Sequence, residues 1–215
     1  MLKKLIGIIS YLPDDTDLRK YRFEILLWLL QSCYRFNTDI LIIAQNWSDN
    51  EINTLKNKVK LDINDKLGIV GARKRLRELF INSDYDYLIM LDDDCDIRAN
   101  DKGISDYLAE IDSHPDCAIE FRGTLLKLYA ISRHIYEQIN FRDDVNAEDG
   151  TGFEDTVFVN DVRKRFPNNI YSFRCRYHGI NEVSKYTGDN YSTWYKDQDI
   201  EEMLKRTHKI VDDNE

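Results

Sequence analysis

The chain has 215 residues, of which 42% are hydrophobic and 32% are charged, a balance that is ordinary for a globular domain with one substantial core. Its formal net charge of −9 disfavours nonspecific electrostatic binding to nucleic acid or to anionic membranes. An acidic protein that binds a nucleotide diphosphate needs local cations, and a bound divalent metal is one source of them.

The four cysteines lie far apart in the sequence and form no Cys-x-x-Cys pair, so neither a zinc knuckle nor a disulfide framework is indicated. We therefore expect reduced thiols in a cytoplasmic protein. The apolar run Leu5 to Ile9 is shorter than the hydrophobic region of a signal peptide. No segment approaches the roughly 20 apolar residues of a membrane helix, and we expect no stable membrane insertion.

The first hundred residues alternate predicted strands and helices. Apolar runs predict strands at 4–10, 39–44 and 87–91, and apolar side chains at helical spacing predict helices at about 17–34, 49–58 and 68–82. This alternation predicts an α/β fold with a mostly parallel sheet flanked by helices. Ligands are expected at the carboxyl edge of its strands.

The pattern changes beyond residue 100. There the sequence predicts helices at 103–113, 134–139, 157–166 and 199–210, and strands at 117–122 and 124–132. We expect a single domain over residues 1–215. Its parts would be a nucleotide-binding half to about residue 100, an acceptor-binding half at about 101–195, and a C-terminal helix and tail at 196–215.

An acidic cluster, Asp92-Asp93-Asp94, directly follows the apolar strand predicted at 87–91. Magnesium and manganese prefer oxygen ligands, and one or two carboxylates typically hold such an ion while phosphates and water complete its coordination. The alternative interpretation is an acidic loop that caps a following helix. The cluster therefore indicates a metal and diphosphate site or a helix cap.

A second acidic pair, Glu154-Asp155, follows the glycines Gly150 and Gly152 and falls in the first turn of the next predicted helix. Carboxylates are favoured at a helix start by the backbone dipole, so one interpretation is a capped helix. The functional interpretation is a carboxylate base on a rigid helix beside a glycine loop.

The order of these features resembles the GT-A glycosyltransferases that use nucleotide sugars. In layout it is most similar to the inverting family-2-like enzymes and the β-1,4-galactosyltransferases. The matching segments are Ile43-Ala44-Gln45-Asn46, Gly71-Ala72-Arg73-Lys74, Asp84-Tyr85-Asp86-Tyr87 running into Asp92-Asp93-Asp94, and Gly150-Thr151-Gly152-Phe153-Glu154-Asp155. The resemblance implies a GT-A, Rossmann-like fold over most of the chain.

The resemblance also implies a divalent metal, manganese or magnesium, held at the acidic cluster. Asp94 would be the direct ligand, with Asp92 near the ion or the ribose and Asp93 structural. Several metal-dependent members of this fold have a third ligand, often histidine, at about the position of His178. His178 is therefore the candidate third ligand, and a hydrogen-bonded structural histidine is the alternative.

The donor implied by the resemblance is a nucleotide-diphosphate sugar, with UDP as the expected nucleotide. Arg73 matches an arginine that contacts the diphosphate, a role suited to a planar guanidinium. Ser10 and Tyr11 end the first strand, where the family places the nucleobase. The chain lacks the Pro-aromatic-Arg that galactosyltransferases carry there.

The implied reaction is a single displacement that inverts the anomeric centre. Asp155 would take the proton of the acceptor hydroxyl, and Glu154 would orient the acceptor by hydrogen bonding. The sequence leaves the acceptor open among a glycan, a teichoic polymer, a lipid-linked molecule, a protein and DNA. The basic segment 163–165 would approach an anionic acceptor or be a solvated helix surface.

Two other functions stay open. A nucleotidyltransferase would also combine a parallel sheet, carboxylates and a nucleotide, but it would normally carry a glycine-rich phosphate loop after the first strand. The segment Tyr11-Leu12-Pro13-Asp14-Asp15 contains no glycine. The other alternative is a non-catalytic protein that binds nucleotides or carbohydrates, which would not need a carboxylate base opposite the acidic cluster.

Overall fold

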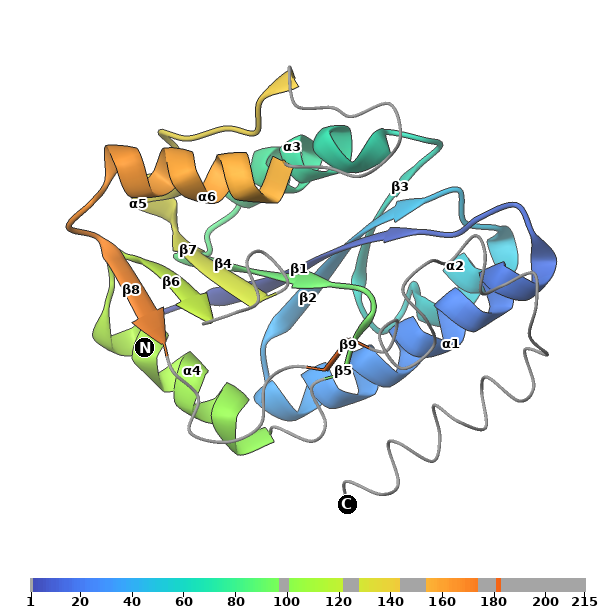
Figure 1. Cartoon of the computed structure of the whole chain (residues 1–215). Coiled ribbons are helices and arrows are strands. Elements are labelled where there is room, and N and C mark those ends of the chain that lie inside the picture. The colour runs from blue at the N-terminus through green and yellow to red at the C-terminus, as the bar shows by residue number, and fades with distance from the viewer. Residues whose placement is uncertain (1, 97–100, 122–127, 144–153, 174–180, 183–215) are drawn as a thin grey trace.

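A computed structural model describes residues 2–96, 101–121, 128–143, 154–173 and 181–182. A seven-stranded sheet runs through its centre, in the order β3-β2-β1-β4-β7-β6-β8 (Figure 1). The strands are β1 (Lys4–Tyr11), β2 (Asp39–Gln45), β3 (Lys60–Asn64), β4 (Tyr87–Asp92), β6 (Ala118–Phe121), β7 (Leu128–Ser132) and β8 (Ile170–Phe173). β7 is antiparallel to both of its neighbours, and every other pair in this sheet is parallel. The predicted α/β fold is confirmed.

The central strands β1, β2 and β4 are buried along nearly their whole length. Their continuous Ile and Leu runs are typical of parallel strands that are covered on both faces. The register places Tyr11 beside Gln45 and Ile9 beside Asp92. The carboxyl ends of these three strands therefore lie together at one edge of the sheet.

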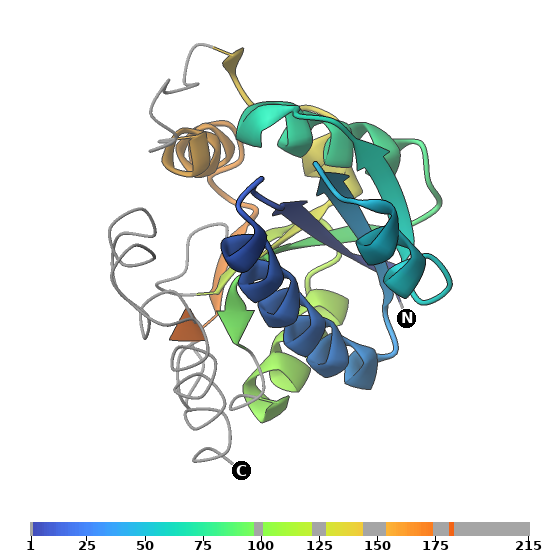
Figure 2. The same ribbon diagram turned by 90° about the vertical axis from the view of Figure 1, so that its right-hand side faces the viewer.

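Helices cover both faces of the sheet (Figures 1 and 2). α1 (Thr16–Cys33), α2 (Asp49–Leu55) and α4 (Asp101–Ser113) contribute to one hydrophobic cluster, and α3 (Gly68–Ile81), α5 (Arg133–Tyr136) and α6 (Glu154–Arg165) contribute to the other. Each cluster packs against the strand side chains on its own face. Two α-layers thus enclose one β-layer, which is the layered core of an α/β domain.

Local sequence explains where the helices next to the carboxyl edge begin. The Asp15 side chain accepts hydrogen bonds from the backbone N–H groups of Asp17 and Leu18 and caps α1. Gly68 opens α3 with φ +69°, a conformation that other residues adopt only with strain. Gly7 lets α3 pack close to β1, since a Cβ there would lie 2.8 Å from Leu76. These positions bring both helices up to the ends of the strands.

Several elements differ from the sequence predictions. β3 and β8 were not predicted, and neither was the two-stranded sheet of β5 (Cys95–Asp96) and β9 (Asn181–Glu182). α2 ends at Leu55, because residues 56–58 form a turn before the edge strand β3. α5 is a single turn, and the predicted helix at 199–210 lies outside the described residues. Within the described residues, no helix is long and apolar enough to cross a bilayer.

Candidate active site at the carboxyl edge of the sheet

A cavity of about 380 Å³ opens at the carboxyl edge of the central strands. Helices α1, α3 and α6 and strands β1, β2 and β4 contribute side chains to it. Six of the predicted site residues line this cavity: Tyr11, Arg73, Asp92, Asp94, Glu154 and Asp155. Ser10 is fully buried and does not line it, and His178 lies outside the described residues.

The acidic cluster sits where β4 ends. Asp92 is the last residue of β4, Asp93 and Asp94 form the turn that follows, and β5 begins at Cys95. The Asp92 and Asp94 side chains are 26% and 19% exposed, whereas that of Asp93 is 8% exposed. The two outer carboxylates therefore have the better access to the cavity, as a metal-binding pair requires.

Two arginines from opposite faces of the sheet hold this cluster. Arg73 of α3 places Nη2 3.0 Å from Oδ1 of Asp92. Arg22 of α1 donates a 2.8 Å hydrogen bond from Nη2 to Oδ1 of Asp93, and its Nη1 lies 3.8 Å from Oδ2 of Asp94. The carboxylates are thus oriented by guanidinium groups within the chain itself.

The cluster is electrostatically strained. Burial raises the pKa of Asp92 to about 6, and Asp94 and Asp155 add to this shift while Arg73 opposes it. Burial likewise raises the pKa of Asp93 to about 6, against the opposing charge of Arg22. Several carboxylates placed together in a partly desolvated site disfavour their own ionisation. A bound cation would relieve that repulsion.

The first turn of α6 brings the second acidic pair to the same cavity. Oδ1 of Asp155 lies 3.6 Å from Nη2 of Arg73. Glu154 is 6% exposed, and its Oε2 has no hydrogen-bond partner among the described residues. The helix dipole favours negative charge at this position. An acceptor hydroxyl that entered the cavity would meet both carboxylates.

An aromatic ring and a further cation also line the cavity. Nζ of Lys66 lies 5.6 Å from the centroid of the Tyr11 ring, within cation–π range. Gln45, which is 2% exposed, accepts a 2.9 Å hydrogen bond at Oε1 from the backbone N–H of Leu67. This bond fixes the turn that presents Lys66 to the cavity.

Sequence reasoning missed Arg22 and Lys66. Arg22 lies three and four residues before the buried Ile25 and Leu26, so a cation in the apolar stripe of α1 was the available signal. Lys66 carried no comparable signal. It occupies an exposed turn between β3 and α3, and β3 itself was not predicted.

The cavity fits a divalent cation by its donor chemistry and its charge. Asp92 and Asp94 offer hard oxygen ligands. Five carboxylates and three cations line the cavity, so two negative charges are left over when all are ionised. In the described part of the chain, however, no three His, Cys, Asp or Glu side chains lie close enough to hold a metal ion. Any further ligand would come from water, the substrate or residues outside that part.

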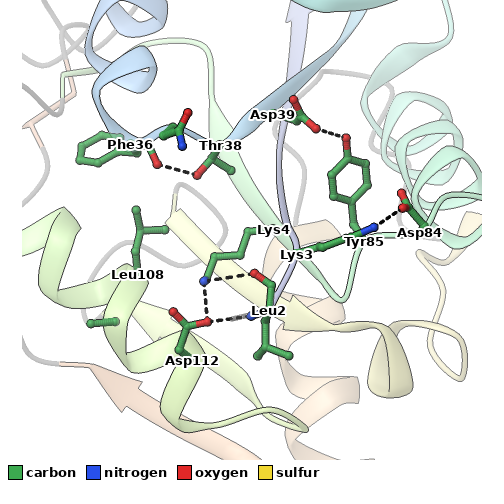
Figure 3. Close-up of a pocket in the computed structure, with 12 residues that line it drawn as sticks. Leu2, Lys3, Lys4, Phe36, Thr38, Asp39, Asp84, Tyr85, Leu108 and Asp112 are labelled. Carbon is green, nitrogen blue, oxygen red and sulfur yellow. Dashed lines mark hydrogen bonds and ion pairs between the residues drawn. The ribbon is translucent and has the colours of Figure 1, made fainter.

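A larger cavity of about 670 Å³ lies at the amino edge of the sheet. Figure 3 shows its charged side chains already paired with one another. Nζ of Lys3 lies 2.5 Å from Asp84, Nζ of Lys4 lies 2.7 Å from Asp112, and the Tyr85 hydroxyl donates to Asp39. None of the predicted site residues that the structure describes lines this cavity.

No protein-family model matches the sequence, and no curated protein matches it by sequence. Solved structures do share its architecture, which is that of the nucleotide-diphospho-sugar transferases. A candidate nucleotide-diphospho-sugar transferase from Desulfovibrio desulfuricans has a TM-score of 0.61 at 10% identity, covering 100% of this chain and 99% of that one.

Two further structures extend the comparison. TarS of S. aureus, residues 1–349, has a TM-score of 0.57 at 13% identity, covering 96% of this chain and 69% of that one. A candidate glucose-1-phosphate thymidylyltransferase from Bacillus anthracis, in complex with sucrose, has a TM-score of 0.61 at 12% identity, covering 97% and 95%. The chain therefore has the GT-A nucleotide-sugar transferase fold that the sequence resemblance predicted.

Proposed function

We propose that this protein is a metal-dependent, inverting glycosyltransferase that moves a sugar from a nucleotide-diphosphate sugar to an acceptor hydroxyl. One observation carries the proposal. The same Arg73 nitrogen lies 3.0 Å from the Asp92 carboxylate and 3.6 Å from that of Asp155. A carboxylate suited to deprotonate an acceptor thus shares one cavity with the acidic cluster suited to hold the metal and donor.

In the proposed reaction Asp92 and Asp94 would hold the ion, with Asp94 as the direct ligand. A bound manganese or magnesium ion would supply positive charge to stabilise the departing diphosphate. Asp155 takes the proton of the acceptor hydroxyl while its oxygen bonds to the anomeric carbon and the bond to the diphosphate oxygen breaks. Glu154 holds the acceptor by a hydrogen bond. Because attack and departure are in line, the anomeric configuration inverts.

Tyr11 and Lys66, which also line the cavity, suit the nucleotide. The Tyr11 ring offers a face for a base, and Lys66 adds a positive charge beside it. We propose a UDP-sugar as the first donor class to test. Ser10 is too buried to contact the base, so we propose that it supports Tyr11 from within β1.

A donor screen tests the proposal directly. The protein is incubated with manganese and a panel of nucleotide sugars, and both nucleotide release and thermal shift are measured. We expect one donor to raise the melting temperature in a manganese-dependent way and to release its nucleoside diphosphate when an acceptor is present. A panel that neither stabilises the protein nor turns over with any acceptor would count against the proposal.

Nucleotidyl transfer is the second candidate, since the fold also occurs in a candidate thymidylyltransferase. The segment between β1 and α1 argues for sugar transfer instead. It contains no glycine, and the Asp14 carboxylate there accepts a 2.8 Å hydrogen bond from the Asn46 side chain. A carboxylate in place of a glycine-rich cradle repels phosphate. Release of pyrophosphate from a nucleoside triphosphate and a sugar phosphate would favour the second candidate.

We propose His178 as the third metal ligand. Asn181, three residues later, pairs with Asp96 just after the acidic cluster, so the described chain returns to the cluster at that point. Neutral imidazole is the form that binds metal, so metal affinity should weaken as the pH falls through the imidazole range. His178→Ala should raise the manganese concentration for half-maximal activity. If activity depends on manganese in the same way in the variant and the parent, His178 has a structural role instead.

A further inference from the structure

Arg73 occupies an unusual position for a residue expected to bind a diphosphate. Its side chain is only 3% exposed, although it lies on α3 among residues that pack against the sheet. Desolvation opposes charge on a buried guanidinium, and the carboxylates of Asp92 and Asp155 lie 3.0 Å and 3.6 Å from its Nη2. Arg73 is therefore held as a cation by two acids that belong to different elements.

The nitrogens of the Arg73 guanidinium differ in their partners within the protein. Nη2 faces both carboxylates, whereas Nε and Nη1 have no hydrogen-bond partner among the described residues. Most arginine donors in a protein interior are paired. The guanidinium does not have a full set of hydrogen bonds among the described residues. The negative charges of Asp92 and Asp155 therefore offset the desolvation cost of burying it.

The two acids that Arg73 joins have separate proposed tasks. Asp92 belongs to the acidic cluster at the end of β4, and Asp155 lies in the first turn of α6. Helices α3 and α6 lie on the same face of the sheet (Figures 1 and 2) and contribute to one hydrophobic cluster. Arg73 is thus a polar link between the base and the donor end of the site.

We propose that Arg73 is a positioning residue that fixes the Asp155 carboxylate relative to the acidic cluster. The inference rests on the proposed function, and it replaces direct contact with the diphosphate as the role of Arg73. A displacement of about 1 Å in a reacting group can cost on the order of 10²-fold in rate. A base that is not anchored on the donor side would incur such a loss.

Lysine is the informative replacement. An ammonium group is a single point charge on a flexible stem, and it lacks the planar fork of arginine. Arg73→Lys therefore keeps a positive charge in the cavity but loses the defined geometry between the two carboxylates. Arg75→Lys is the matched control, because Arg75 lies on the same helix and pairs instead with Asp62 and Glu78.

The test is a double-mutant cycle that combines Arg73→Lys with Asp155→Asn. We expect Arg73→Lys alone to lower turnover at saturating donor by on the order of 10²-fold, with the affinity for free nucleoside diphosphate changed less than about threefold. In the Asp155→Asn background, Arg73→Lys should lower turnover by less than about threefold, because there is no base left to position. Arg75→Lys should match the parent.

Two kinetic results would overturn the inference. One is a double variant whose fold-loss of turnover equals the product of the two single fold-losses. The other is a loss of nucleoside diphosphate affinity as large as the loss of turnover, which is the signature of a direct contact with the diphosphate.

A measurement without donor separates this inference from the proposed function. Thermal unfolding in excess chelator is recorded for Arg73→Lys, Asp155→Asn and the double variant. If Arg73 holds Asp155, the two losses in melting temperature should be non-additive. This coupling is expected even if no sugar is ever transferred, and additive losses would refute the link.

A second variant covers the case in which Arg73→Lys does not fold. Asp155→Asn alone should then lower the melting temperature more than Asp161→Asn does, because only the first removes a carboxylate that balances Arg73. Equal melting temperatures for these two variants would overturn the inference.

Discussion

The two edges of the sheet carry cavities that differ in how their charges are held. At the amino edge, Lys3 and Asp84 form an ion pair whose side chains are 62% and 75% exposed, and its hydrogen bond lowers the pKa of Asp84. At the carboxyl edge, burial raises the pKa values of Asp92 and Asp93 to about 6. In the larger cavity each charged side chain is paired with one of opposite charge. In the smaller cavity neighbouring carboxylates disfavour each other's ionisation.

This difference identifies the site better than cavity size does. Paired charges on a solvated surface lower the free energy of the folded chain slightly, or not at all. Carboxylates that are close together in a partly desolvated cavity raise the free energy of the folded chain. Such an arrangement is typical of functional sites. Variants at the carboxyl edge should therefore change activity far more than stability, and variants at the amino edge should change neither by much.

The largest effect is expected at the acidic cluster. Asp94→Ala should reduce sugar transfer by about 10³-fold or more, because a metal ion supplies several kcal/mol to the departing group. Circular dichroism should show an unchanged fold. Asp106→Ala, at an exposed position of α4, is the control. Full turnover in the presence of excess chelator would contradict the metal requirement.

The next effect is expected at the helix that faces the cluster. Asp155→Asn should lower turnover by about 10²–10⁴-fold, the usual contribution of a placed base, with donor affinity nearly unchanged. Asp161→Asn on the same helix is the control, and Glu154→Gln should instead raise the acceptor KM. Retention at the anomeric carbon, seen by product analysis, would rule out the single displacement.

A smaller effect concerns pH and the free energy of unfolding. The Asp93 carboxyl has an ordinary pKa of 3.8 and a folded-state value of about 6, so the folded chain binds its proton more tightly than the unfolded chain. The contribution of this carboxyl to stability is then largest below about pH 4 and falls as the pH rises towards 6, by on the order of 1 kcal/mol per pH unit.

Chelator-treated protein should therefore show a melting temperature that decreases between pH 5 and pH 6.5. Asp93→Asn should make this slope shallower, because the amide mimics the protonated carboxyl, while Asp92, whose pKa is also raised to about 6, keeps part of it. Asp84→Asn should leave the slope unchanged, since the pKa of Asp84 is lowered and lies below this window. A melting temperature that rises across the window would show that Asp93 is not strained by burial.

The smallest effect is expected at the amino edge. Lys3→Ala should leave sugar transfer at the parent level and shift the melting temperature only slightly, since the Lys3 and Asp84 pair is highly exposed. Steady-state kinetics and a thermal scan in low and in moderate salt are sufficient. A loss of turnover comparable to that of Asp155→Asn would mean that the two edges are energetically coupled.

Much of the framework was predictable from sequence because its signals are local. The apolar runs of β1, β2 and β4 and the capped start of α1 specify strands and helices within a few residues. Asp92 was predictable because it follows an apolar strand directly, and Asp155 because it falls in the first turn of a predicted helix. The parallel register explains why Asp92 lies at the carboxyl edge, whereas the structure is needed to place Asp155 on the same cavity.

The missed features depend on tertiary contacts. β3 is an edge strand with Ile63 53% exposed, so its five residues show little of the burial pattern that marks a strand. The burial of Arg73 did have a local signal, because Val70 lies three residues before it and Leu76 three residues after it on the apolar face of α3. The sequence could not show that acids contributed by β4 and α6 would pair with it.

The short ladder between β5 and β9 has a consequence for how the protein folds. Asp96, immediately after the acidic cluster, pairs with Asn181, which belongs to the last described segment of the chain. Contacts between residues so distant in sequence form slowly, because a long loop must first be closed. During synthesis the parallel core can assemble early, whereas the border of the acidic cluster must wait for the carboxyl-terminal part to emerge.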